Sequence, residues 1–431
     1  MTSERQLKTA DWLEVSQRFE PACMNWQAPV VWDHGRGAEI WDVDGKHYFD
    51  WTSGVLVTNV GHAHPKLAAA VAAQAGRLLN TFDFPTPERL ALAQKLIERT
   101  PPHLDKVIFM TTGAEAMDAS LRMARKYSQN FEIVAFWGGF HGRSFGPMSV
   151  TGLAKIKKHF GPMVPGTILA PYPYCYRCPF DKTYPDCDLF CLDFLDRVVD
   201  TESSGYLAGM IVEPYQGTSG FVFPPKGYMK KLEEWAAKRG LVFILDEVQS
   251  SYGRTGKMWA LEHENLKPDI LCLGKGIGSG APISAVISTT KIFSALGSGE
   301  MSSTMGGNPL CSAGALAVLE IMDEENLVEK AARNGEVLKA HLLELMKKFD
   351  FIGDVRGLGL VYGVEFVKSR ETRAPAPDLA REIVVRCVSR GLMCGKLGLY
   401  GNVMRVAPPL VITPEQIDQS VAILRGVLEE M

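Results

Sequence analysis

The sequence predicts an α/β fold in which a mostly parallel sheet forms a large domain and a smaller α+β domain follows it. Two observations support this fold class: short apolar runs alternate with helical stretches, and a long helical stretch followed by short strands occupies the C-terminal quarter. The length of 431 residues suggests two or three domains. Because 46% of the residues are hydrophobic and 22% are charged, the composition is that of a folded globular protein, which excludes disorder, collagen and coiled coil.

The large domain is expected to span residues 61–320. Six short apolar runs are predicted to be strands buried on both faces, namely 107–110, 133–136, 210–212, 241–245, 270–273 and 283–287. Apolar spacing of 3.6 residues predicts helices at 116–127 and 228–239. This alternation of strand and helix is typical of a parallel sheet covered by helices.

The two ends of the chain are predicted to form the rest of the molecule. Residues 321–431 are expected to be a small C-terminal domain with helices at 326–349 and 414–431 and short strands within 357–367. Residues 1–60 are expected to pack with this small domain. Within them, Asp44-Gly45 lies between two alternating runs, which predicts a hairpin turn.

Charge and cysteine content indicate which partners and which compartment to expect. The sequence has 46 Lys and Arg against 49 Asp and Glu, a net charge of −3 that offers no basic surface for nucleic acid or an anionic membrane. Its apolar runs fall far short of the roughly 20 residues that span a bilayer, and charges are scattered where a signal peptide would be apolar. Nine unevenly placed cysteines do not suggest a disulfide scaffold. We therefore expect a cytoplasmic protein that acts on small molecules.

Polar residues follow three of the predicted strands, at the strand ends where open α/β sheets bind ligands. The run 107–110 leads into Thr111-Thr112-Gly113-Ala114 and then a helix. Such a junction directs free backbone N–H groups and the positive end of the helix dipole at an anion, typically a phosphate. For this segment alone, the alternative is an ordinary capped helix.

An acid and a lysine end two further strands. Asp246 follows the run 241–245, and a buried carboxylate needs a cationic partner or several donors; the alternative is a helix N-cap. Lys275 follows 270–273 between two glycines, which permits close approach of a ligand and the depressed pKa that imine-forming lysines require; the alternative is a solvated lysine. Residues 276–281 also fit a dinucleotide fingerprint, but a strand and not a helix is predicted after them, so we expect no dinucleotide.

A phosphate cradle, a strand-end aspartate and a strand-end lysine together match the requirements of pyridoxal phosphate. The lysine would hold the aldehyde as a Schiff base, and the aspartate would keep the pyridine nitrogen protonated. The helix N-terminus would hold the phosphate.

Eight motifs, in order, carry a family resemblance over about residues 41–413. They are TSGVLVTNVGHAHP (52–65), TTGAEA (111–116), GGFHGRS (138–144), VEPYQG (212–217), LDEVQSSYGRTG (245–256), LGKGI (273–277), STMGGNP (303–309) and MRVAPPLVIT (404–413). With these motifs the sequence resembles the class III pyridoxal-phosphate-dependent aminotransferases of fold type I. This family includes the 4-aminobutyrate, ornithine and other ω-amino acid aminotransferases.

The resemblance implies a role at the cofactor for each matching residue. Lys275 would form the Schiff base, and Asp246 would pair with the pyridinium nitrogen. The other implied cofactor contacts are the backbones of Gly113 and Ala114 at the phosphate, Phe140 and Val248 on the two ring faces, Gln249 at the ring oxygen, and His141 and Glu213 beside them.

The resemblance also implies how substrates bind and how subunits assemble. Arg405 would grip an α-carboxylate, Arg143 a distal carboxylate, and Val55 would line the substrate site. No metal is expected at this site. Thr304 would reach the phosphate of the neighbouring subunit, which implies a homodimer, or a dimer of dimers, with shared active sites.

The implied reaction is transamination by a ping-pong mechanism. An ω-amino acid resembling 4-aminobutyrate, or an α-amino acid, would give its amino group to 2-oxoglutarate or pyruvate. Some ω-amino acid enzymes of the family carry a glutamate at the position of Thr218, where it pairs with the carboxylate-binding arginine. Its absence here is expected to favour ligands with an α-carboxylate.

Two other functions are compatible with the same motifs. A class III racemase or epimerase would use the same lysine and the same cofactor and differ only in where the proton returns. A non-catalytic oligomer of the same fold is disfavoured, because binding alone would not need Lys275, Asp246 and Gln249 together.

Four cysteines form a separate cluster in an insertion rich in Pro and Tyr. Cys175, Cys178, Cys187 and Cys191 have the C-x₂-C and C-x₃-C spacings that suit zinc or an iron–sulfur cluster. The eight residues between the two pairs are few, and none of the eight family motifs includes the cluster. We therefore expect free thiols without a metal.

Overall fold

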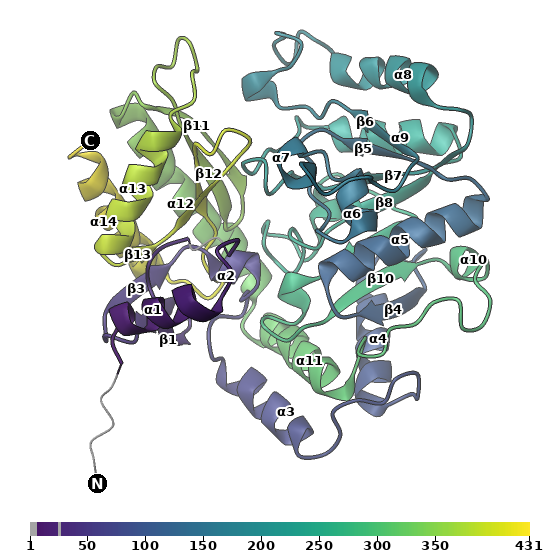
Figure 1. The fold of residues 1–431 in the computed structure, drawn as a ribbon, viewed down its shortest axis with the longest axis horizontal. Helices are drawn as coiled ribbons and strands as arrows, with labels where there is room; N and C mark the ends of the chain where they lie inside the picture. Colours follow the sequence, from purple (N-terminus) through teal and green to yellow (C-terminus); the bar gives the residue numbers. More distant parts are fainter. Residues whose placement is uncertain (1–6, 25–26) are drawn as a thin grey trace.

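The computed structural model describes residues 7–24 and 27–431. The chain forms a large α/β unit and a second unit built from both ends of the chain, which lie side by side (Figure 1). In the described part of the chain, no helix combines the length and the apolar character needed to cross a membrane.

The large unit contains a seven-stranded sheet in the order β4-β10-β9-β8-β7-β5-β6. Its strands are β4 (Lys106–Met110), β5 (Glu132–Phe136), β6 (Thr167–Ala170), β7 (Leu207–Val212), β8 (Val242–Asp246), β9 (Ile270–Leu273) and β10 (Ser284–Ser288). All neighbouring pairs are parallel except those of β10, which runs antiparallel to both β4 and β9. The predicted α/β class with a mostly parallel sheet is therefore confirmed.

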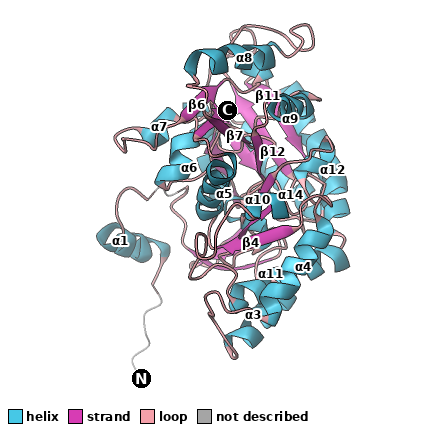
Figure 2. Ribbon diagram, turned by 90° about the vertical axis from the view of Figure 1, so that its right-hand side faces the viewer, coloured by secondary structure: helices cyan, strands magenta, loops and turns pink. Residues whose placement is uncertain are grey.

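Alternate side chains of the central strands enter two different cores because helices cover both faces of the sheet. On β8, Ile244 packs with helix α5, whereas Phe243 and Leu245 pack with helices α9 and α11. Figure 2 shows these layers edge-on. The helices and 3₁₀ turns of this unit are α3 (Pro65–Ala75), α4 (Pro87–Arg99), α5 (Gly113–Ser128), α6 (Phe145–Val150), α7 (Ala154–Lys157), η1 (Cys175–Arg177), α8 (Phe190–Glu202), α9 (Tyr228–Lys238), η2 (Ala260–His263), η3 (Lys275–Ile277), α10 (Thr290–Phe293) and α11 (Pro309–Glu324).

All six predicted strands are present; 270–273 coincides with β9, and the ends of the others differ by at most three residues. The sequence does not predict the strand β6. It is four residues long, lies at the sheet edge beside β5, and has only alternate residues buried. A short, half-buried edge strand lacks the continuous apolar run that marks the central strands. A strand, β10, and not a helix follows residues 276–281, which agrees with the rejection of a dinucleotide fingerprint.

The C-terminal part forms an antiparallel sheet in the order β11-β12-β15-β14. The elements of this C-terminal part are α12 (Leu327–Lys348), β11 (Ile352–Leu358), β12 (Val361–Phe366), α13 (Pro377–Ser389), β13 (Leu392–Met393), β14 (Gly395–Leu397), β15 (Val403–Val406) and α14 (Pro414–Leu428). The helices α12 and α14 occupy the two stretches where the sequence predicts helices.

The N-terminal segment joins this C-terminal part through a shared sheet. It contributes α1 (Thr9–Phe19), β1 (Trp32–Arg36), β2 (Glu39–Asp42), β3 (His47–Asp50) and α2 (Ser53–Leu56). The strand β3 pairs in parallel with β13. The predicted turn lies between β2 and β3, where Gly45 has a φ of 83°, a conformation that favours glycine. Helix α1 stands apart from the body of the molecule (Figure 2).

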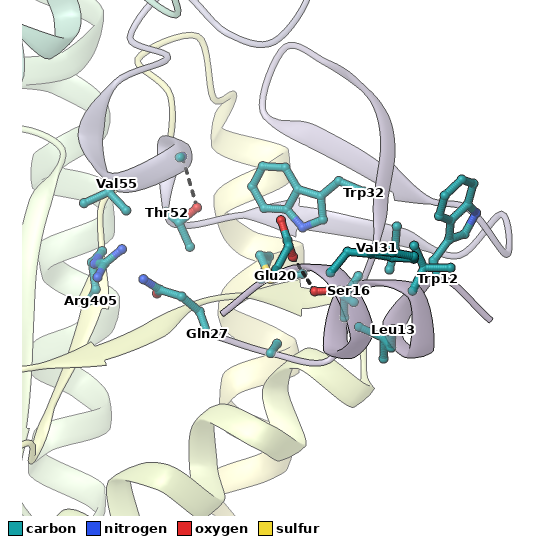
Figure 3. A pocket seen from close by; sticks show the side chains of 16 residues that line it. Trp12, Leu13, Ser16, Glu20, Gln27, Val31, Trp32, Thr52, Val55 and Arg405 are labelled. Carbon is teal, nitrogen blue, oxygen red and sulfur yellow. Dashed lines mark hydrogen bonds between the residues drawn. The ribbon is translucent and has the colours of Figure 1, made fainter. Parts of the chain in front are cut away.

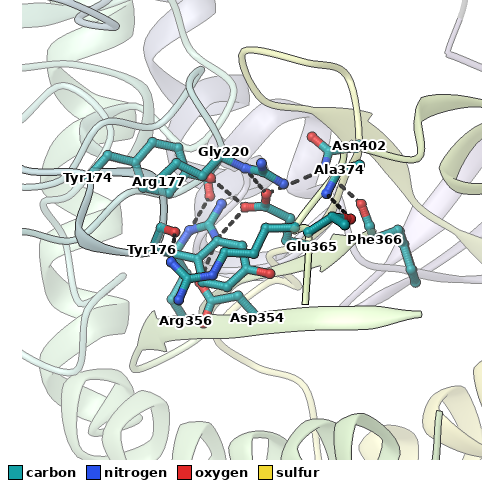
Figure 4. A network of polar contacts seen from close by, with 12 residues as sticks. Tyr174, Tyr176, Arg177, Gly220, Asp354, Arg356, Glu365, Phe366, Ala374 and Asn402 are labelled. Carbon is teal, nitrogen blue, oxygen red and sulfur yellow. Dashed lines mark hydrogen bonds and ion pairs between the residues drawn. The ribbon is translucent and has the colours of Figure 1, made fainter. Parts of the chain in front are cut away.

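A buried ion-pair network ties the cysteine-bearing insertion to the C-terminal sheet (Figure 4). Glu365 of β12 is fully buried and accepts hydrogen bonds from Tyr174, from Arg177 Nε at 2.5 Å and from Arg356 Nη1 at 2.7 Å. Burial raises the pKa of Glu365, but the charges of both arginines and the Tyr174 hydroxyl outweigh it, so the pKa is lowered overall. The carboxylate therefore stays ionised and holds the insertion in place.

Candidate active site

The junction between β4 and α5 presents two unpaired backbone donors. Thr112 caps α5 through its hydroxyl, and Glu115 in return accepts the N–H groups of Thr111 and Thr112 at 2.6 and 3.1 Å. The next two N–H groups, those of Gly113 and Ala114, find no acceptor among the described residues. Free N–H groups in the first turn of a helix favour an anion, and the phosphate-binding role of these two residues stays a prediction.

Asp246 ends β8 and is held by two hydrogen bonds. Its Oδ2 lies 2.7 Å from His141 Nδ1, and its Oδ1 accepts the N–H of Val248 at 3.0 Å. Both side chains are almost fully buried, Asp246 at 5% exposure and His141 at 4%. These two partners satisfy a carboxylate that would be costly to bury alone.

Glu213 follows β7 and orders the loop that carries Phe140. Its carboxylate accepts the N–H groups of Phe140 at 2.9 Å and Gly217 at 3.1 Å. Burial raises the pKa of Glu213 to about 7, His141 opposes this rise, and the charge of Asp246 adds to it. Phe140 itself is half-buried.

Lys275 follows β9 in a strained backbone conformation with a φ of 46°. Burial lowers the pKa of its amine, Asp246 and Glu213 oppose this shift, and the positive charge of Arg405 adds to it. A Cβ on the flanking Gly276 would come within 2.6 Å of Asn59 Nδ2, so a side chain there would have to displace the buried Asn59 amide. The amine is thus held in a setting that favours its neutral, nucleophilic form.

Val248 lies between the start of α5 and the turn that leads to Lys275, and Gln249 lies next to Gly217. A Cβ at Gly113 would approach Val248 Cγ1 to 2.8 Å, and one at Gly274 would approach the same atom to 3.0 Å. The side-chain oxygen of Gln249 is buried and has no partner among the described residues. This set of groups fits pyridoxal phosphate. It comprises free N–H groups at a helix start, a buried carboxylate, a lysine with a lowered pKa and a glutamine oxygen without a partner.

Arg405 of β15 is a buried guanidinium without a countercharge at hydrogen-bond distance. It is 6% exposed, and its Nε and Nη1 have no partner within the described chain. Burial lowers its pKa, whereas the charge of Asp50 raises it. The Asp50 carboxylate is already engaged, with Thr52 N at 2.6 Å and His62 Nε2 at 2.8 Å. An unsatisfied buried guanidinium is costly, so a carboxylate ligand would bind here with a large gain.

A cavity of about 660 Å³ lies next to Arg405, between the body of the molecule and helix α1 (Figure 3). It is lined by Trp12, Leu13, Val15, Ser16, Phe19, Glu20, Gln27, Ala28, Val30, Val31, Trp32, Thr52, Gly54, Val55, Met393 and Arg405. The predicted substrate residues Val55 and Arg405 lie at the same end of it.

Two of the predicted site residues lie elsewhere in this chain. Arg143 is exposed and does not line the cavity beside Arg405, and Thr304 is also exposed. Their roles toward a distal carboxylate and a neighbouring subunit stay predictions. Sequence patterns do not indicate Trp12, Gln27 or Trp32, because these residues share a cavity with Arg405 only after segments nearly 400 residues apart come together.

The four clustered cysteines surround one small cavity. It is lined by all four side chains together with Phe180, Leu189 and Phe190 and other residues of the insertion. Burial raises the pKa of Cys175 to about 11 and that of Cys191 to about 12, and the neighbouring thiols add to both shifts. Across residues 7–24 and 27–431, no three His, Cys, Asp or Glu side chains are arranged to hold a metal ion.

We expect protein prepared without chelator to contain no stoichiometric zinc or iron. The raised pKa values keep the thiols of Cys175 and Cys191 protonated near neutral pH, and metal binding requires thiolates. Elemental analysis checks this, with a chelator-treated sample as the control. The expectation would be contradicted by one metal ion per chain whose removal by the chelator unfolds the insertion.

Comparison with known proteins defines the class of protein to which this fold and site belong. Residues 23–428 match the family described as aminotransferase class III, and the chain belongs to this family. The pyridoxal-phosphate dependence and the fold type I architecture expected from the sequence are thereby confirmed.

Three proteins illustrate how similar the chain is to known members in sequence and in structure. The chain is 36% identical to a leucine/methionine racemase of Thermococcus litoralis, covering 94% of this chain and 91% of that protein. It is 35% identical to a probable 4-aminobutyrate aminotransferase of Bacillus subtilis, covering 97% and 98%. A solved (S)-enantioselective ω-transaminase from Thermomicrobium roseum superimposes with a TM-score of 0.92 at 30% identity, covering 98% and 99%.

Proposed function

We propose that this aminotransferase moves the amino group of an ω-amino acid such as 4-aminobutyrate or 5-aminovalerate, or of an α-amino acid, to 2-oxoglutarate or pyruvate. The observation that carries the proposal is the buried, unpaired guanidinium of Arg405, whose charge acts on the amine of Lys275. A substrate carboxylate at Arg405 would leave an amino group within the same site. The similarity to a probable 4-aminobutyrate aminotransferase supports the choice of donor.

The cofactor, when bound, supplies an aldehyde that accepts the amino group and a ring that withdraws electrons. Lys275 would hold the aldehyde covalently and then, as a free amine, move a proton at the substrate carbon. Asp246, positioned by His141, would keep the ring nitrogen protonated. The remaining residues proposed to hold the cofactor are Gly113 and Ala114 at the phosphate, Phe140 and Val248 at the ring faces, Gln249 at the ring oxygen and Glu213 behind Phe140.

The two arginines would divide the carboxylates between them. Arg405 offers a planar fork for the carboxylate of the oxo acid, and Arg143 would take the carboxylate of an ω-amino acid or the distal one of glutamate. Thr218 cannot pair with Arg405 as a glutamate would. Leaving Arg405 unpaired costs about 1–3 kcal/mol, so ligands with an α-carboxylate should be favoured.

A panel of donors assayed with each of the two acceptors tests this proposal. We expect 4-aminobutyrate, 5-aminovalerate and several L-α-amino acids to transfer their amino group, with ping-pong kinetics for each productive pair. Omitting the acceptor is the control and should stop turnover after the first half-reaction. Failure of every donor with both 2-oxoglutarate and pyruvate would contradict the proposed acceptors.

We also propose that the enzyme is a homodimer whose subunits share their active sites, so cofactor affinity should depend on assembly. Thr304 is exposed in the single chain and would donate to the phosphate bound by its partner. The substitution Thr304→Ala should weaken cofactor binding by about 1.5–3 kcal/mol, the value of a hydrogen bond to a charged group. The neighbouring Ser302→Ala is the matched control, since Ser302 is also exposed.

Sedimentation and cofactor titration over a dilution series check this coupling. We expect dilution to lower the dimer fraction and the bound cofactor together. A monomer that is fully active at assay concentration would show that the site is complete within one chain.

Racemisation of amino acids is the second candidate, because the similarity to a leucine/methionine racemase is as high as that to the aminotransferases. The proton would then return to the opposite face of the same carbon and no oxo acid would be released. The family match favours transamination.

A further inference from the structure

A second cavity, of about 650 Å³, lies where the cysteine-bearing insertion meets the C-terminal part of the chain. The large unit contributes Trp137 and the segment 172–183 to its walls, and the other unit contributes Arg373 and the loop 399–400. This cavity shares no lining residue with the cavity beside Arg405. Its volume lies within the range of roughly 300–1,000 Å³ for small-molecule sites, and no step of the proposed transamination involves it.

The walls of this interunit cavity carry two exposed aromatic rings on fixed backbones. Trp137 is 48% exposed and Tyr400 is 53% exposed. Gln216 Nε2 donates to the carbonyl oxygen of Trp137 at 2.8 Å. Beside Tyr400, the N–H of Gly398 donates to the carbonyl oxygen of Thr218 at 3.1 Å. Aromatic faces held in this way offer surfaces on which a planar ring can stack.

Positive charge exceeds negative charge around the interunit cavity. Three cations line it, and Asp181 is the one carboxylate among its described lining residues. Arg373 donates to the carbonyl oxygen of Tyr176 at 2.9 Å, and Lys182 Nζ lies 4.7 Å from the centre of the Phe190 ring. Neither of these two cations has a carboxylate partner among the residues that the structure describes. Both are therefore available to an anion.

The third cation, Arg177, has a donor that the protein leaves unused. Its Nε donates to Glu365 at 2.5 Å, which balances its charge (Figure 4). Its Nη2 is buried and has no partner within residues 7–24 and 27–431. The guanidinium carbon lies 5.4 Å from the centre of the Tyr176 ring and 5.3 Å from that of Tyr400. Because an unpaired buried donor is costly, this arginine favours a ligand that brings hydrogen-bond acceptors.

We infer that the interunit cavity is a second ligand site, which binds a planar aromatic molecule that carries a phosphate or carboxylate group. The ring stacks on Trp137 and Tyr400, and the anionic group binds Arg373 and Lys182. Since Trp137 and Tyr400 belong to different units, such a ligand contacts both units of the chain. The inference goes beyond the proposed transamination and does not depend on it.

Calorimetry on the holoenzyme with probes of known composition tests the site. AMP and indole-3-acetate each combine a planar ring with an anionic group. Adenosine and indole lack the anion, whereas inorganic phosphate and acetate lack the ring. We expect AMP or indole-3-acetate to bind once per chain, at least about tenfold more tightly than its ring or its anion alone. The tighter of the two identifies the preferred anion as a phosphate or a carboxylate.

Two substitutions locate the binding. Arg373→Ala should weaken the tighter probe about tenfold or more, as expected for a lost hydrogen bond to a charged group. Tyr400→Ala should weaken it about fivefold or more through the loss of stacking. The matched controls, Arg381→Ala and Tyr206→Ala, remove an exposed arginine and an exposed tyrosine that do not line the cavity, and should leave Kd unchanged. Retained visible absorption of the cofactor verifies that each variant is folded.

Three results would overturn the inference. The first is that neither probe binds at millimolar concentration, and the second is that binding survives both Arg373→Ala and Tyr400→Ala. The third is equal affinity for a probe and for its anion alone, because stacking would then contribute nothing. Indole-3-acetate is also measured with Arg405→Ala, where its binding should persist. Loss of all its binding in that variant would place this probe in the substrate site and leave only AMP to support the inference.

Discussion

Lys275→Ala should abolish the covalent link to the cofactor while leaving the phosphate cradle able to bind it. The amine lies after β9 in a setting that lowers its pKa, whereas the donors of Gly113 and Ala114 belong to α5 and do not depend on it. Loss of the proton-transferring group alone should lower the transamination rate by roughly 10²–10⁴-fold. The visible absorption of the linked cofactor should disappear, and dialysis should then remove the cofactor.

The matched control is Lys267→Ala, which removes an exposed lysine from the loop before β9. It should retain absorption and rate. Reduction with borohydride followed by peptide mapping identifies the linked lysine directly in the unaltered protein. An adduct of the same yield in Lys275→Ala would show that another residue forms the link.

Arg405→Ala should lose about 2–5 kcal/mol of transition-state binding in the half-reaction with the oxo acid. The reason is the burial of the guanidinium, with two of its donors unpaired until a carboxylate arrives. Arg143→Ala should mainly slow the half-reaction with an ω-amino acid. Arg405→Lys should recover part of the loss, because it keeps the charge and removes the planar fork.

Measuring both half-reactions separately by stopped-flow absorbance checks this division. The matched control is Arg381→Ala, whose exposed side chain pairs with Asp378 one turn away on α13. It should leave both half-reactions unchanged. Equal losses in the two half-reactions from either active-site change would show that the arginines do not divide the carboxylates in this way.

The parts of the site that the sequence predicts are those fixed by single strands of the sheet. Asp246 ends β8 and Lys275 follows β9, and because these strands are neighbours and parallel, both residues come to the same edge of the sheet. The local pattern of an apolar run followed by one polar residue is enough to place such groups. The helix start at Gly113 is predicted in the same way, because it follows the apolar run of β4.

Other parts of the fold and of the site depend on contacts between distant segments, and a local sequence pattern does not predict such contacts. The strand β6 is too short and too exposed to be recognised from its apolar content. The cavity that α1 shares with Arg405 and the network around Glu365 each join residues nearly 200 or more positions apart. Their residues are ordinary tryptophans, tyrosines and arginines until the fold brings them together.

The claim that the site transaminates is tested most directly by a single turnover without any oxo acid. The holoenzyme is mixed with one L-amino acid from the productive donors, and the cofactor absorption and the products are followed. We expect the visible absorption to be lost, with one oxo acid formed per active site and no D-enantiomer. Retained absorption with steady accumulation of the D-enantiomer would contradict transamination and identify a racemase.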